Sequence, residues 1–146
     1  MIVDSGNYDY EPGPMRNYCR STKAHNTVEI DDKDQCHLWG TFRVAERATP
    51  RDVTFRTLDD GFKLNAWQDG YQRLEAKATH ERTIQFKETT GLMVKDSINA
   101  GHSVKAVSRI HFHPDCSITQ LTETSLEITR AKVCCHVEWN PKCQAT

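Results

Sequence analysis

Short segments rich in β-branched and aromatic residues follow one another along the chain from residue 52 onward. Turn-forming residues separate them, as in Asp59-Asp60-Gly61 and Asn99-Ala100-Gly101. Short strands with turn signals at this spacing predict an antiparallel meander or sandwich. The predicted strands cover residues 53–57, 62–67, 79–86, 92–98, 104–113 and 126–137.

Strict alternation of residue type is cleanest between residues 104 and 113. Side chains at every second position of a strand share one face. We therefore expect the even-numbered positions of this segment to face the core and the odd-numbered positions to face solvent. In the segment 79–86 the same rule places His80 and Arg82 in line with two apolar core residues.

The first fifty residues have a different pattern. They are rich in turn formers, and only residues 27–30 show strand-like alternation. No stretch of the chain predicts an amphipathic helix of three turns. We therefore predict a single all-β, antiparallel, sandwich-like domain over residues 1–146, with a loop-rich region at 1–50 and strands at 51–146.

Composition supports a folded domain and argues against some partners. Hydrophobic residues make up 37% of the chain, enough for a core. The net charge of -1 is too balanced to favour nucleic acid or a membrane surface, and no run of about 18 apolar residues predicts a membrane span.

Ile2-Val3-Asp4 reads like the end of a strand whose start is missing, so we expect a fragment of a larger protein. The six cysteines, including Cys143, are expected to be free thiols.

The stretch from residue 18 to residue 27 carries the densest set of chemical groups. Arg20 supplies forked donors suited to a carboxylate. His25 supplies an imidazole, the side chain best suited to general acid or base chemistry near neutral pH. Asn26 can donate to a developing oxyanion. The alternative is a capped turn whose polar groups merely satisfy one another.

Two further groups of residues suggest binding sites. Imidazoles such as His25 and His80, together with a carboxylate from Asp31 or Asp34, would suit zinc, although their spacing in sequence is not diagnostic. Trp39 can stack on a sugar ring. Its neighbours Gln35 and Arg43 can supply hydrogen bonds to that sugar, but Trp39 and Phe42 can equally be core anchors of a loop.

Several runs of residues, taken in order, resemble the C-terminal β-domain of the heparinase II/III-like polysaccharide lyases. The most specific run is Arg20-Ser21-Thr22-Lys23-Ala24-His25-Asn26-Thr27-Val28. Weaker pieces follow in the expected order along most of the chain. They include Leu38-Trp39-Gly40-Thr41-Phe42-Arg43-Val44, Asp69-Gly70-Tyr71, His80-Glu81-Arg82-Thr83 and His111-Phe112-His113-Pro114-Asp115.

The resemblance implies β-elimination of uronate-containing polysaccharides by a bacterial enzyme that is periplasmic or secreted. Full members carry a preceding helical toroid, which supplies the main tyrosine, while the β-domain lends a histidine. By motif position that histidine is His25. Arg20, Asn26, Trp39 and Arg43 would then contact an acidic polysaccharide, and the isolated domain should be inactive.

Some members of this family also hold zinc through two histidines and an aspartate. The resemblance points to His80, with His25 as the second histidine if it is not catalytic, and to Asp34 or alternatively Asp31 as the aspartate. Two other interpretations stay open. One is a non-catalytic carbohydrate-binding or structural module that uses Trp39, Tyr71 and Arg43, and the other is a metal-stabilised fold with no substrate role.

Overall fold

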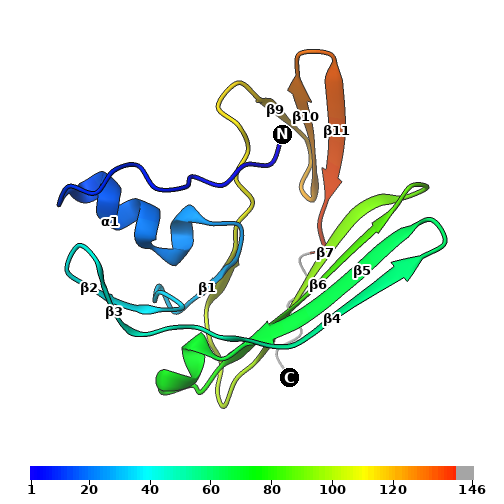
Figure 1. Ribbon diagram of the computed structural model, residues 1–146. Coiled ribbons are helices and arrows are strands. Elements are labelled where there is room, and N and C mark those ends of the chain that lie inside the picture. The colour runs from blue at the N-terminus through cyan, green and yellow to red at the C-terminus, as the bar shows by residue number, and fades with distance from the viewer. Residues whose placement is uncertain (141–146) are drawn as a thin grey trace.

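The computed structural model describes residues 1–140, and its largest element is a four-stranded antiparallel sheet (Figure 1). The sequence pattern predicted each of these strands, and the structure confirms them within a few residues. Their order in the sheet follows the chain, with tight turns at the first and third connections and a longer segment, residues 69–78, at the second. They are β4 (Pro50–Leu58), β5 (Gly61–Gln68), β6 (Thr79–Lys87) and β7 (Gly91–Asn99).

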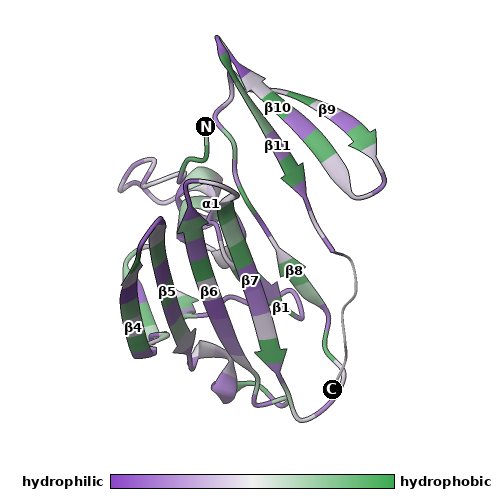
Figure 2. Ribbon diagram, turned by 90° about the vertical axis from the view of Figure 1, so that its right-hand side faces the viewer, coloured by the Kyte–Doolittle hydropathy of each residue, from purple (hydrophilic) through white to green (hydrophobic). Residues whose placement is uncertain are grey.

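A second sheet of three strands, β9 (Ser117–Thr122), β10 (Ser125–Arg130) and β11 (Val133–Glu138), stands beside the first (Figure 2). The prediction of one strand over residues 126–137 was wrong, because Ala131 adopts a positive φ of 52° and turns the chain into a hairpin. Strand β9 was not predicted. Its apolar residues Ile118 and Leu121 lie three positions apart, which breaks the period of two.

The predicted strand over residues 104–113 is regular only at β8 (Ala106–Ser108), which pairs with β1 (Val28–Ile30). The rest of this segment does not pair along its length with another described strand. It pairs only at isolated points, such as the bridge between Ile2 and Phe112. The predicted faces were also wrong within β8, because Val107 is half-buried while Ala106 and Ser108 are exposed.

The N-terminal region holds more structure than the predicted loops and single strand. Helix α1 (Pro14–Arg20) has proline in its first turn, where the missing N–H costs nothing. The short 3-10 helix η1 (Thr22–Ala24) follows it and leads into β1. Strands β2 (His37–Trp39) and β3 (Arg43–Glu46) then form a small hairpin.

The central core lies where β1 meets the ends of β6 and β7. Val28, Ile30, Tyr71 and Ala78 are its fully buried members, and Ile98 packs against them. All three residues of β1 are buried. Because β1 leaves directly from the segment that carries His25, this core fixes where that segment emerges at the surface.

The 3-10 helix η2 (Gly70–Arg73) packs closely against the N-terminal region. A Cβ atom on Gly70 would lie 2.2 Å from the carbonyl oxygen of Gln35 and 2.7 Å from the Cβ of Ala48. Only glycine allows this approach. Nearby, Asp69 accepts hydrogen bonds from Thr49 N and from the Arg51 guanidinium, which together hold its pKa below the usual range.

Candidate functional site

The segment from Arg20 to Thr27 is the candidate site, and hydrogen bonds from distant parts of the chain fix its backbone. Ser5 Oγ donates to the carbonyl oxygen of Ala24 at 2.9 Å. Asp34 accepts from the backbone N–H of Thr22 at 2.6 Å, and Thr22 Oγ1 accepts from Gln35 N at 2.7 Å. The segment is therefore held at both ends of η1 by residues of other loops.

His25 lies at the surface of this segment with one-third of its side chain exposed. Its Nδ1 lies 2.8 Å from Asp4 Oδ2, and its Nε2 lies 3.0 Å from the carbonyl oxygen of Cys19. Both ring nitrogens face oxygen acceptors, an arrangement that a cationic imidazolium satisfies with its two N–H groups. The hydrogen bond from His25 lowers the pKa of Asp4, so a negative charge stays beside the ring.

Asn26 uses its side-chain amide to join two other chain segments. Its Nδ2 donates to the carbonyl oxygen of Val3 at 2.8 Å, and its Oδ1 accepts from His111 N at 2.6 Å. The predicted donation to a substrate oxyanion would compete with the first of these bonds. Asn26 therefore bridges two backbone segments. An amide side chain suits this position because it has both a donor group and an acceptor group.

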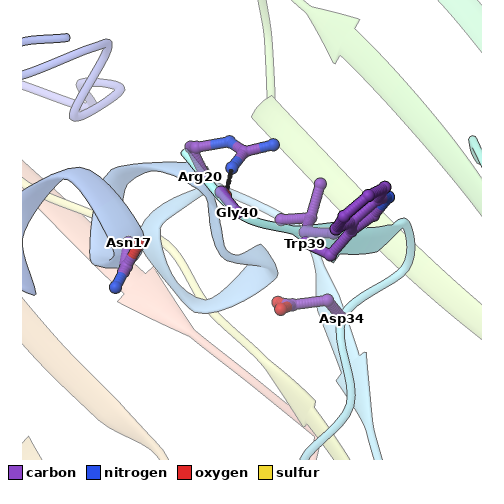
Figure 3. A pocket seen from close by; sticks show the side chains of 6 residues that line it. Asn17, Arg20, Asp34, Trp39 and Gly40 are labelled. Carbon is purple, nitrogen blue, oxygen red and sulfur yellow. Dashed lines mark hydrogen bonds between the residues drawn. The ribbon is translucent and has the colours of Figure 1, made fainter. Parts of the chain in front are cut away.

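Arg20 and Trp39 meet at a surface pocket that Asn17, Asp34 and Leu38 also line (Figure 3). Arg20 donates to the carbonyl oxygens of Gly40 and Arg43, the latter at 2.8 Å, which ties the end of α1 to the β2–β3 hairpin. These contacts occupy two of its five N–H donors. The remaining N–H groups of Arg20 can donate hydrogen bonds to a bound anion.

Trp39 is 51% exposed and therefore is not a core anchor. The guanidinium of Arg43 lies over its ring at 4.4 Å from the centroid, a cation–π contact. Phe42, the other predicted anchor, is also exposed and stacks with Tyr10. Trp39 and Arg43 together form a flat, polar-edged surface beside the pocket.

His80 and Arg82 form a network with Asp96 beneath the candidate site. His80 is 3% exposed, and its Nε2 lies 2.8 Å from Asp96 Oδ1. Arg82 binds both carboxylate oxygens of Asp96, at 2.6 and 2.8 Å, and also donates to the carbonyl oxygen of Asn26. Burial alone would raise the pKa of Asp96, but the hydrogen bonds from His80, Arg82 and Ser108 hold it well below its usual range.

Tyr71 cannot contact a sugar, which corrects the binding-module interpretation at that residue. Its side chain is fully buried and donates from its hydroxyl to the carbonyl oxygen of Val28 at 2.7 Å. Burial raises the pKa of this phenol to about 12, so the hydroxyl keeps its proton. The residue instead anchors the strand that follows the candidate site.

The predicted zinc ligands do not converge in the described part of the chain. His25 bonds Asp4 and Cys19, His80 bonds Asp96, and the alternative carboxylate Asp31 accepts from Lys105 N. Within residues 1–140, one group of potential ligands does bring its ligand atoms within 4.8 Å of one another. It consists of Glu127, Cys134 and His136, and the sequence pattern missed it.

The missed group had a signal in the sequence. Cys134 and His136 are two residues apart and so share one face of a strand. Glu127 joins them only because the chain turns at Ala131 and Lys132, and the prediction of one continuous strand hid that turn. Cys19, Cys36, Cys116, Cys134 and Cys135 are free thiols, and Cys143 lies outside the described residues.

Comparison with known proteins identifies the class of domain to which this fold and this ordered loop belong. A family model described as heparinase II/III-like, C-terminal, matches residues 1–136. The chain therefore belongs to the heparinase II/III-like C-terminal domain family. No curated protein and no solved structure matches it. Among the described residues, no helix has the length and apolar character needed to cross a lipid bilayer.

Proposed function

We propose that this domain forms one wall of the substrate site of a polysaccharide lyase that cleaves uronate-containing chains by β-elimination, with His25 in the reaction. The main observation in support of this proposal is the position of His25. Its ring is partly exposed, is held by a carboxylate on one side, and contacts Cys19, the residue before Arg20. Family membership supports the same reaction class. A helical toroid domain would supply the facing wall.

In the proposed reaction, a base removes the proton from C5 of the uronate. The electrons of that C–H bond form the C4–C5 double bond, and the glycosidic oxygen at C4 leaves and takes up a proton. Negative charge gathers on the C5 carboxylate before the bond to oxygen breaks. Groups that donate hydrogen bonds to that carboxylate lower the barrier.

His25 suits the role of donor to this developing charge. Asp4 holds Nδ1 and keeps a negative charge beside the ring. Nε2 can exchange its contact with the Cys19 carbonyl for a carboxylate oxygen of the substrate. Asp4 then acts as a positioning residue for the imidazole, because its contact with Nδ1 fixes the ring orientation and leaves Nε2 to meet the substrate.

Arg20 and Trp39 suit the binding of the acidic sugar. Arg20 presents its unused N–H donors at the pocket and matches a carboxylate in charge and geometry. Trp39 has one ring face against Arg43, and a sugar ring can stack on its other face. The predicted zinc ion takes no part in this proposal, because His25, His80 and Asp34 do not fit a shared ion in this arrangement.

The test is the release of unsaturated uronate products, followed by alkene absorbance, in a protein that joins this domain to its toroid domain. His25→Ala should lower turnover about 100- to 1000-fold, the cost of one lost donor to developing charge. His102→Ala, a matched change at an exposed histidine in another loop, should leave turnover unchanged. Unchanged turnover in His25→Ala would remove this residue from the reaction.

A non-catalytic carbohydrate-binding module is the second candidate, and the exposed pair Trp39 and Arg43 favours it. This alternative predicts that uronan oligosaccharides bind while no unsaturated product forms in the joined protein. Trp39→Ala would then weaken binding, and His25→Ala would not. The same absorbance assay therefore separates the two candidates.

A further inference from the structure

The sheet formed by β9, β10 and β11 has one mostly polar face and one mostly apolar face. Residues directly opposite one another in an antiparallel pair share a face, as do residues two positions apart on a strand. Glu127 lies opposite His136, and Thr129 lies opposite Cys134. These four side chains therefore share one face, whereas Ile128 and the neighbouring thiol Cys135 lie on the other.

Three side chains of this polar face meet at one point. His136 Nε2 lies 3.5 Å from Glu127 Oε2 and 3.9 Å from Cys134 Sγ. The carboxylate, the thiol sulfur and the imidazole nitrogen all lie within 4.8 Å of one another. One carboxylate oxygen, one sulfur and one imidazole nitrogen form a ligand set that suits zinc and similar thiophilic divalent cations.

The distances can be compared with those around a tetrahedral zinc ion. Zinc–sulfur bonds of about 2.3 Å and zinc–nitrogen or zinc–oxygen bonds of about 2.0 Å place sulfur and nitrogen about 3.5 Å apart, and nitrogen and oxygen about 3.3 Å apart. The observed separations of 3.9 and 3.5 Å exceed these values by only a few tenths of an ångström. The third pair, the Cys134 sulfur and the Glu127 carboxylate oxygen, also lies within 4.8 Å, so closure of these three side chains would bring their ligand atoms to one ion.

We infer that Glu127, Cys134 and His136 bind a thiophilic divalent cation, with Zn²⁺ as the best match, on the polar face of the β10–β11 hairpin. The three protein ligands leave a fourth tetrahedral position for water. The side chain of His136 is 65% exposed and that of Glu127 34%, so the ion can enter directly from solvent. The bound ion would join β10 to β11 across their shared turn.

This site is separate from the candidate sugar site. None of its ligands belongs to the Arg20–Thr27 segment or to the His80–Asp96 network. Its chemistry also differs, because one of its ligands is a cysteine sulfur, whereas the predicted set of His25, His80 and Asp34 contains none. A spectroscopic signal from metal-bound sulfur therefore distinguishes binding at Glu127, Cys134 and His136 from binding at the predicted set of His25, His80 and Asp34.

Cobalt(II) is the probe that tests the inference. The 146-residue chain, reduced and stripped of metal, is titrated with Co²⁺ while sulfur-to-cobalt charge transfer and visible ligand-field bands are recorded. We expect both bands to saturate at one ion per chain and to disappear when Zn²⁺ is added. His136→Ala should weaken Co²⁺ binding by more than about 100-fold, because even changes to outer-shell partners cost 10- to 100-fold.

A matched pair of cysteine variants decides the outcome. Cys134→Ser should abolish the charge-transfer band, whereas Cys135→Ser, at the adjacent thiol on the opposite face, should retain it. Both positions are exposed, so neither change should disturb folding. The inference is overturned if the wild-type chain shows no sulfur-to-cobalt band, or if Cys134→Ser keeps the band at full intensity.

Discussion

Replacing Asp96 with asparagine is the sharpest perturbation of the network beneath the candidate site. The change keeps the shape of the side chain and removes its charge. Asp96 accepts from His80 Nε2, from two nitrogens of Arg82 and from Ser108 Oγ, at distances between 2.6 and 2.8 Å. The amide side chain of the variant would have one acceptor oxygen in place of two and would leave the Arg82 guanidinium without its counter-charge.

The magnitude follows from the burial of the pair. Hydrogen bonds to charged groups contribute about 1.5–3 kcal/mol each, and removing one partner of a buried ion pair costs about 3–5 kcal/mol. The side chains of Arg82 and Asp96 are 18% and 16% exposed, so solvent screens part of this interaction. We therefore expect Asp96→Asn to lower the free energy of unfolding by about 3 kcal/mol, at the lower end of that range.

Urea denaturation at neutral pH measures this loss as a lower midpoint with an unchanged slope. Asp59→Asn, at an exposed aspartate in the β4–β5 turn, is the matched control and should change the free energy of unfolding by less than about 0.5 kcal/mol. A loss below about 1 kcal/mol in Asp96→Asn would contradict the assignment of Asp96 as the buried counter-charge of Arg82, because the carboxylate would then contribute little more than a neutral hydrogen bond.

The same variant has a defined dependence on pH. The folded-state pKa of Asp96 lies well below its unfolded value of about 3.9, so its stabilising contribution is fully present above that value. The contribution is lost as pH falls below about 4 toward the folded-state pKa. The difference in unfolding free energy between wild type and Asp96→Asn should be constant above about pH 5 and shrink at lower pH.

Two further substitutions test the packing that positions the candidate site. Tyr71→Phe removes the hydrogen bond to the Val28 carbonyl and should cost about 1–2 kcal/mol by urea denaturation, whereas Tyr8→Phe, at an exposed residue, should be neutral; equal effects would contradict the assignment. Gly70→Ala should cost about 2 kcal/mol or more because its Cβ would overlap backbone, while Gly13→Ala, with open space around it, should cost clearly less.

Much of the fold follows from local patterns in the sequence. The strands of the four-stranded sheet are rich in β-branched and aromatic residues and are bounded by turn residues, so their positions were predictable. The period of two along a strand placed His80 and Arg82 on one face. Their partner Asp96 was not predictable, because it comes from the neighbouring strand and depends on the register that sets it opposite Arg82. Register arises from packing between strands and leaves little trace in a single sequence.

The candidate site shows the same division between local and tertiary information. The motif from Arg20 to Thr27 was visible as a cluster of polar groups, and it does reach the surface. The hydrogen-bond partners of these polar groups were not visible in the sequence. Asn26 binds two backbone segments, and Asp34 accepts a hydrogen bond from the backbone N–H of Thr22. These contacts join residues more than ten positions apart, so only the folded chain reveals them.

Residues that looked alike in sequence differ in burial. Trp39 and Tyr71 were both candidates for sugar contact, yet Trp39 is half exposed and Tyr71 is fully buried. The difference arises because η2 packs against β1, where the tyrosine hydroxyl finds a backbone acceptor. Aromatic residues in loops can serve either role, and tertiary packing decides between them.

An NMR titration tests most directly whether acidic sugar binds beside His25. The isotope-labelled 146-residue chain is titrated with an unsaturated uronate oligosaccharide. We expect saturable shifts in the His25 ring, the Arg20 side chain and the Trp39 indole, with no comparable shifts in the β9–β11 sheet. We also expect Arg20→Ala to weaken this binding. Saturable shifts confined to other surfaces, with these three side chains unaffected, would contradict the proposed sugar site.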